Sequence, residues 1–136
     1  MAILCRHAAT LLNMRFVHEL AADPAALQPA RVLLEAWCLS EHIDPESMVI
    51  IANELCTNAI RHGQGTVVLT ASGSPDRLGL GVRQEARYEL AIPVPDSSSD
   101  LQITGRGLLM VDALAESWGW QLTASSTFVW ARLSRR

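Results

Sequence analysis

Two side chains that carry oxygen, Glu54 and Asn58, stand four residues apart in a stretch with helical periodicity. Residues at i and i+4 lie one turn apart on the same side of a helix, so a carboxylate and a carboxamide point the same way. Such a pair can hold Mg²⁺ through its oxygens, or position a water or hydroxyl. On spacing alone, the pair also fits the solvated stripe of an ordinary amphipathic helix.

The helix that must position this pair is predicted to run from Pro45 to His62. Asp44 offers a side-chain oxygen as N-cap, Pro45 suits the first helical position, and Gly63 is a ready terminator. At roughly 100° per residue, an apolar face forms with a polar stripe beside it. The apolar face consists of Met48, Ile51, Ala52, Leu55 and Ala59, and the stripe of Ser47, Glu54, Asn58 and Arg61.

The rest of the chain alternates between strand and helix patterns, which predicts an α+β fold with a mixed sheet covered by helices on one face. We expect a single domain over residues 1–136, in which residues 1–13 form an extension of unclear structure. The predicted elements are a strand from Met14 to Leu20, a helix from Asp23 to about Leu39, a hairpin of Thr66 to Ala71 with Leu78 to Val82, a short extended piece from Tyr88 to Ile92, a loop from Pro93 to Thr104, a helix from Gly107 or Leu108 to about Ser117, and a closing hairpin of Gly119 to Thr123 with Phe128 to Leu133.

The charge balance excludes several classes of function. A net charge of -3 and a pI near 5.7 give no electrostatic footprint for nucleic acid, so we expect no direct nucleic-acid partner. All 11 basic residues are arginine. The absence of lysine excludes a P-loop lysine, a Schiff-base lysine and the ordinary protein-kinase lysine. Phosphate chemistry would therefore rely on arginine, backbone N–H groups and metal.

The three cysteines, Cys5, Cys38 and Cys56, are widely spaced and include no C-x-x-C pair. This pattern predicts buried free thiols in a reducing compartment and argues against a zinc site or a disulfide framework. The N-terminal stretch is interrupted by Arg6 and His7, and its apolar run is too short for a signal peptide or a membrane span. We therefore expect a cytoplasmic protein without membrane contact.

Two sequence blocks carry a resemblance to a known superfamily. Residues 53–63, Asn-Glu-Leu-Cys-Thr-Asn-Ala-Ile-Arg-His-Gly, resemble the N-box of the GHKL (Bergerat-fold) ATPases, in the form found in stand-alone anti-sigma factor serine kinases. Residues 105–111, Gly-Arg-Gly-Leu-Leu-Met-Val, followed by Leu114-Ala115 and Trp118-Gly119, are similar to the second glycine box and its helix. The resemblance covers about residues 14 to 133 and implies the Bergerat fold.

The resemblance implies a role for each matching residue. Glu54 would orient or deprotonate the attacking group, and Asn58 would coordinate an Mg²⁺ ion that bridges the phosphates of ATP. Backbone N–H groups of the Gly105-Arg106-Gly107-Leu108 turn, at the start of a helix, would bind phosphate, and Arg106 would add charge-assisted hydrogen bonds. His62 also matches a frequent family position. A plain glycine-rich helix entry and a satisfied histidine at a helix end remain the alternatives for the turn and for His62.

The chain departs from the family pattern in two places. Gln84 stands where the first glycine box would have the Asp that accepts a hydrogen bond from the adenine amino group, and no Gly follows it. Its side-chain oxygen can still accept a hydrogen bond, and Asp96 is the other candidate for this role. Near the C-terminus, Ser126-Thr127-Phe128 stands where Gly-Lys-Thr often precedes the last strand of the family.

Three functional hypotheses remain open at this point. The first is an anti-sigma-factor-like regulator that binds Mg-ATP, phosphorylates a Ser of an anti-sigma antagonist and holds a sigma factor. The second is a degenerate GHKL domain that regulates by protein contact without nucleotide turnover. The third is a homodimeric structural module, to which Leu4, Leu11 and Leu12 of the N-terminal extension would contribute. The sequence names neither the sigma factor nor the antagonist.

Overall fold

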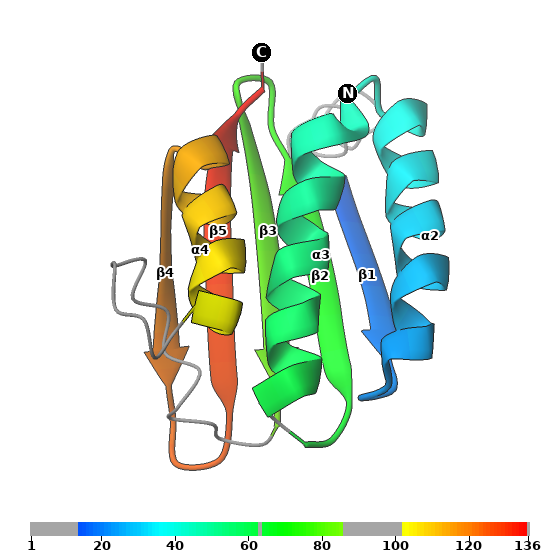
Figure 1. The fold of residues 1–136 in the computed structure, drawn as a ribbon. Helices are drawn as coiled ribbons and strands as arrows, with labels where there is room; N and C mark the ends of the chain where they lie inside the picture. Colours follow the sequence, from blue (N-terminus) through cyan, green and yellow to red (C-terminus); the bar gives the residue numbers. More distant parts are fainter. Residues whose placement is uncertain (1–13, 63, 86–101, 136) are drawn as a thin grey trace.

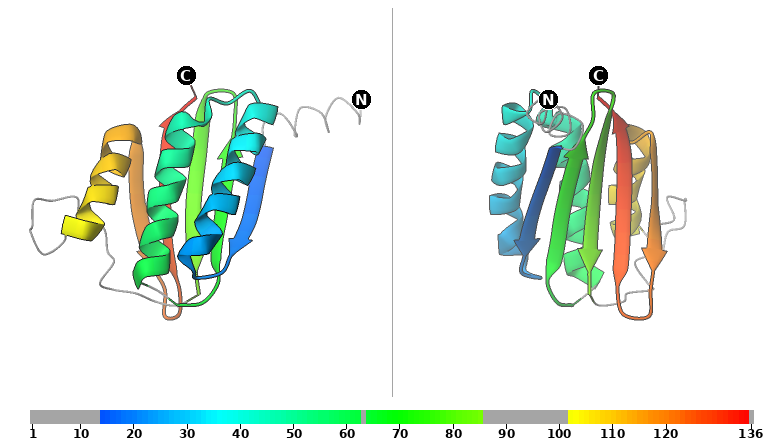
Figure 2. Two further views of the ribbon diagram at one scale, coloured as in Figure 1. Left: turned by 45° about the vertical axis from the view of Figure 1, so that its right-hand side comes forward. Right: turned by 180° about the vertical axis from the view of Figure 1, so that it is seen from behind.

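The computed structural model describes residues 14–62, 64–85 and 102–135. One five-stranded sheet forms the first layer, and the helices α2, α3 and α4 lie side by side on one of its faces (Figure 1; Figure 2). This arrangement confirms the predicted two-layer α+β fold. The elements are β1 (Met14–Leu20), the 3-10 helix η1 (Pro24–Ala26), α2 (Leu27–Ser40), α3 (Pro45–His62), β2 (Val67–Gly73), β3 (Arg77–Gln84), α4 (Gln102–Leu114), β4 (Ser117–Leu122) and β5 (Thr127–Ser134).

The sheet has the strand order β1-β2-β3-β5-β4, and every neighbouring pair among the described strands is antiparallel. The expectation of a mixed sheet was therefore wrong. The connection from β1 to β2 passes through two helices, which return the chain to the edge where β1 ended, whereas a single crossover helix would have made this pair parallel. Helix α4, the described helix between β3 and β4, joins parallel strands, but β5 lies between them.

Helix α3 begins and ends where the sequence predicts. Asp44 Oδ1 accepts a hydrogen bond from the backbone N–H of Glu46 at 3.1 Å, which confirms the predicted N-cap. The predicted apolar face is buried, with Met48, Ile51 and Ala59 fully inaccessible to solvent. Gly63, the predicted terminator, lies outside the described residues. None of the described helices combines the length and the apolar composition needed to cross a bilayer.

Helix α4 differs from its prediction at both ends. It begins at Gln102, so Gly105 and Gly107 lie inside the helix, and it ends at Leu114 because Ser117 already belongs to β4. Residues 102–104 contain neither Pro nor Gly, and a glycine inside a helix costs only about 1 kcal/mol, so the helix extends through the glycine pair. The loop predicted up to Thr104 is therefore wrong for residues 102–104. Its earlier part and the extended piece from Tyr88 to Ile92 lie outside the described residues.

Two of the three cysteines are buried free thiols, as predicted. Burial raises the pKa of the Cys38 thiol to about 11, with further contributions from the nearby carboxylates of Asp44 and Glu35. Burial alone raises the pKa of Cys56 to about 12. Both groups are therefore neutral packing residues at physiological pH. Cys5 lies outside the described residues.

A pair of Leu→Ala substitutions tests whether α3 is anchored by its buried face. Leu55 is 1% exposed, and we expect Leu55→Ala to lower the free energy of unfolding by about 2–5 kcal/mol through lost apolar contacts and a residual cavity. Leu39 is 59% exposed on α2, and Leu39→Ala should change stability by less than about 0.5 kcal/mol. Urea unfolding of the two variants measures both values, and equal losses would contradict the packing described here.

Candidate functional site

The sequence-predicted site residues come from elements that meet at one edge of the molecule. The C-terminal end of α3, the end of β3, the start of β5 and the N-terminal end of α4 all lie at this edge, which is the lower one in Figure 1. Helix α3 packs against both α4 and β3. The fold therefore brings the polar stripe of α3 close to the last residues of β3.

Glu54, Asn58 and His62 form a row along the side of α3 that borders α4. Asn53 faces the other way, toward α2, because its Oδ1 accepts a hydrogen bond from Arg31 Nη1 at 2.9 Å. Asn58 lies five residues beyond Asn53, a rotation of roughly 140° at 100° per residue, which turns it away from α2. Glu54 and His62 are half-buried, and Asn58 is only 6% exposed. The spacing had left open that these residues form a fully solvated stripe. Their burial excludes that alternative for this side of α3.

The carboxamide of Asn58 has the chemistry of a ligand for a hard cation. Its Oδ1 atom is buried and accepts no hydrogen bond from any described residue, while the side chain as a whole does have an interaction partner. Glu54 provides a carboxylate one helical turn away. In the described part of the chain, His, Cys, Asp and Glu side chains nowhere gather in threes as they do in a protein-only metal cage. A metal ion held here would complete its coordination with water or with ligand oxygens, as Mg²⁺ commonly does.

Gln84, the last residue of β3, is fully buried and points toward the helix layer, in line with the alternating burial of Leu78, Leu80 and Val82. Its Nε2 donates a hydrogen bond to the backbone oxygen of Gly65 at 3.2 Å. Its Oε1 accepts no hydrogen bond from the described residues. An unsatisfied buried acceptor costs about 1–3 kcal/mol, so this oxygen is suited to a donor from a bound molecule.

Thr127 is a residue of this edge to which the sequence analysis gave no role. It is 2% exposed and lies directly across the β3–β5 ladder from Gln84. Strand alternation sends both side chains to the helix face of the sheet. The sequence signal that could have identified Thr127 was its position at the start of the last strand, in the Ser126-Thr127-Phe128 stretch that replaces the family's Gly-Lys-Thr.

The pKa of His62 is lowered from its ordinary value of 6.5, first by partial burial and second by the positive charge of Arg61. A pKa below 6.5 leaves the imidazole mainly neutral at pH 7, the form in which one ring nitrogen donates and the other accepts. A contact with phosphate at this position would be an uncharged hydrogen bond and not an ion pair.

The glycine box was predicted to form a turn at the start of a helix, but the structure places it inside α4. Gly105, Arg106 and Gly107 lie in the first turns of α4, where the N–H groups of Arg106 and Gly107 fall within the helical hydrogen-bond ladder. The side chain of Arg106 lies outside the described part of the chain, as does Asp96. Leu108 is 2% exposed and packs in the hydrophobic core, and its contact with a ligand stays a prediction.

Comparisons with known proteins agree with this architecture. The model of the family described as "Histidine kinase-like ATPase domain" matches residues 20–133. A solved structure of the RsbU and RsbW domains of Rv1364c from Mycobacterium tuberculosis superposes with a TM-score of 0.66 at 18% identity, over 90% of this chain. This chain spans only 33% of that one. The Acinetobacter baumannii histidine kinase AdeS superposes with a TM-score of 0.50 at 15% identity, over 99% of this chain and 77% of its own. Among curated protein sequences, none is significantly similar.

The environment of His62 predicts a pH dependence of stability. Because its pKa is lowered in the folded state, the unfolded chain binds a proton more readily as the pH falls through the region around 6.5, and the folded state loses stability there. We expect His62→Gln to lose less stability than the wild type between about pH 7.5 and pH 5.5, and Arg61→Gln to lie between the two. Melting temperatures across this range measure the effect, and parallel pH profiles for all three proteins would contradict it.

Proposed function

Because this chain belongs to the histidine kinase-like ATPase domain family, we propose that it binds Mg-ATP at the edge formed by α3, β3 and β5 and acts as a cytoplasmic regulator resembling the anti-sigma factor kinases. The observation that carries the nucleotide site is the fully buried Oε1 of Gln84, which accepts no hydrogen bond from the described residues. The exocyclic amino group of adenine is a donor of the right kind for this oxygen. In this proposal Gln84 keeps the acceptor role that Asp has in the family.

The metal and phosphate end of the proposed site lies along α3. Asn58 would bind Mg²⁺ through Oδ1, and phosphate and water oxygens would complete the coordination of the ion. The neutral imidazole of His62 and the guanidinium of Arg106 would add hydrogen bonds to the phosphates. A bound Mg²⁺ would supply charge neutralisation at the phosphates, which these residues would orient.

The proposed reaction is phosphoryl transfer to a serine hydroxyl of an anti-sigma antagonist. Glu54 would accept the hydroxyl proton while the serine oxygen bonds to the γ-phosphorus, and the bond from that phosphorus to the β,γ-bridging oxygen breaks to release ADP. The half-buried position of Glu54, one turn from Asn58, supports this role because it keeps the base next to the metal. A sigma factor would be the second protein partner. The form of the N-box in residues 53–63 and the structural likeness to a chain that contains an RsbW domain support this choice of partners.

A second candidate function is protein binding without nucleotide turnover, and two observations favour it. Gln84 is neutral where the family pattern has a carboxylate, and its amide also donates to Gly65. In addition, α4 engages the N–H groups of Arg106 and Gly107 that a phosphate-binding turn would present. On this reading Gln84→Asp should sharply raise the affinity for ATP, and an affinity that is already tight and stays unchanged would count against it.

Nucleotide binding can be tested at Gln84 with a matched substitution elsewhere. Titration calorimetry with Mg-ATP should give measurable heat for the wild type, and Gln84→Leu, which removes the acceptor, should weaken binding by about tenfold or more. Mg-ITP, whose base lacks the amino group, should bind the wild type as weakly as Mg-ATP binds the variant. Gln121→Leu, an exposed position on the other face of the sheet, should bind like the wild type. No heat at millimolar nucleotide would remove the proposal.

Glu54→Gln separates catalysis from binding. This variant keeps the shape of the side chain but cannot accept the hydroxyl proton, so we expect its affinity for Mg-ATP to stay within about threefold while turnover falls by about 10²-fold or more. ADP release from Mg-ATP with water as acceptor measures turnover without an identified protein substrate. Weak binding with no ADP release by the wild type would instead select the second candidate.

A further inference from the structure

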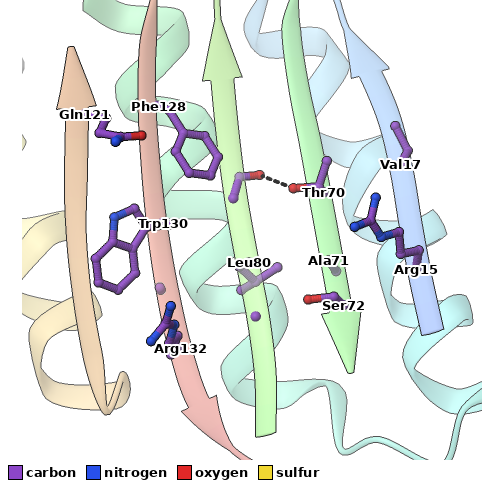
Figure 3. Close-up of a pocket in the computed structure, with 13 residues that line it drawn as sticks. Arg15, Val17, Thr70, Ala71, Ser72, Leu80, Gln121, Phe128, Trp130 and Arg132 are labelled. Carbon is purple, nitrogen blue, oxygen red and sulfur yellow. Dashed lines mark hydrogen bonds between the residues drawn. The ribbon is translucent and has the colours of Figure 1, made fainter. Parts of the chain in front are cut away.

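The face of the sheet opposite the helices is not covered by any described element (Figure 2). It contains a depression of about 530 Å³ over the middle strands, shown in Figure 3. Gly79 and Gly81, at the centre of β3, line it and carry no side chain on this face. A Cβ at Gly81 would lie 2.7 Å from Cε1 of Phe128, and one at Gly79 would lie 2.9 Å from Oγ of Ser72. Larger residues would clash with these two side chains, so both positions favour glycine.

Two arginines stand at the ends of one row of residues across this depression. Arg15 of β1 pairs with Ser72, Ser72 with Gly79, and Gly79 with Arg132 of β5. The row crosses three strand spacings of about 4.8 Å, so the two arginine backbones lie roughly 14 Å apart. In Figure 3 the side chain of Arg15 points toward Thr70, over the floor of the depression.

The charge of this depression is opposite in sign to the net charge of the chain. None of its 13 lining residues is Asp or Glu, although the chain has a net charge of -3. Within the described part of the chain, the salt bridge joins Arg77 to Glu116 at 3.1 Å, and neither Arg15 nor Arg132 has a carboxylate partner. The depression is therefore a local basic site on an acidic protein.

Aromatic rings orient two arginines, Arg132 of the depression and Arg83 next to it on β3. Arg132 lies over the ring of Trp130 at 5.3 Å, and Arg83 lies over Phe128 at 5.0 Å. The Trp130 ring also approaches Gly119, where an added Cβ would lie 2.8 Å away. Glycine backbone and guanidinium groups already contact both rings, which leaves less ring surface on which a nucleic-acid base could stack. A guanidinium held in this way is instead preorganised for carboxylates.

We propose that this depression is the docking surface for an acidic segment of a partner protein. One carboxylate would bind Arg15 and another Arg132, at a separation that about four residues of extended chain span at 3.4 Å per residue. The hydroxyl groups of Ser72 and Thr70 would hydrogen-bond the backbone of the segment between these anchors. A second copy of this chain would present its own arginines to the same face, so charge repulsion disfavours self-association here. This surface is separate from the proposed nucleotide site, which lies on the helix side of the sheet.

The test uses a fluorescein-labelled decaglutamate peptide as the probe, with binding measured by fluorescence anisotropy. We expect the wild type to bind with an affinity that falls as salt increases, and Arg15→Glu and Arg132→Glu each to weaken binding by about threefold or more, the double variant by about tenfold or more. Arg61→Glu, an exposed arginine of α3 on the other side of the molecule, makes the same charge change and should leave the affinity within about twofold. Arg15→Gln and Arg132→Gln provide milder variants if charge reversal impairs folding, which melting temperatures report.

Several outcomes would overturn the proposal. No binding of decaglutamate at millimolar concentration would do so. Equal losses of affinity for Arg61→Glu and Arg132→Glu would also do so, because they would mean that the peptide is attracted by the overall charge of the protein and not by this depression. Tighter binding of a 20-nucleotide poly(dT) strand that decaglutamate cannot displace would identify a nucleic-acid surface instead. A dimer in sedimentation that Arg132→Glu dissociates would identify a second copy as the occupant.

Discussion

The burial of one apolar stripe of α3 against the sheet fixes the rotation of this helix, and with it the direction of every polar side chain that the helix carries. Met48, Ile51 and Leu55 are almost completely buried, so α3 cannot turn without exposing them. The same rotation directs Asn53 toward α2 and buries Asn58 on the side of α3 that borders α4. The direction of these α3 side chains in the candidate site is thus a consequence of core packing.

Strand alternation sets the second half of the arrangement. Even-numbered residues of β3 point into the helix layer, which buries Gln84 at the end of the strand, opposite Thr127 of β5. The odd-numbered residues point to the open face, where Gly79 and Gly81 leave a depression between basic side chains. A shift of β3 by one residue would exchange the two sets, so the register of a single strand specifies both surfaces.

The sequence predicted α3 because its ends carry local signals: Asp44 caps the N-terminus, and a complete apolar stripe follows. It misplaced the start of α4 because glycine only weakens a helix and does not by itself end one. The strand directions depend on which strands become neighbours: β3 and β4 are parallel but β5 lies between them, and no residue near either strand reports this. The burial of Asn58 and the opposition of Gln84 and Thr127 are tertiary facts that spacing could not reveal.

A crystal structure with a non-hydrolysable ATP analogue and Mg²⁺ tests the central claim, that α3 and β3 together form a nucleotide site, most directly. The account predicts that the adenine amino group lies within hydrogen-bond distance of Gln84 Oε1 and that the metal ion is bound by Asn58 Oδ1. A nucleotide bound elsewhere on the molecule, or crystals that take up none at millimolar concentration, would contradict it.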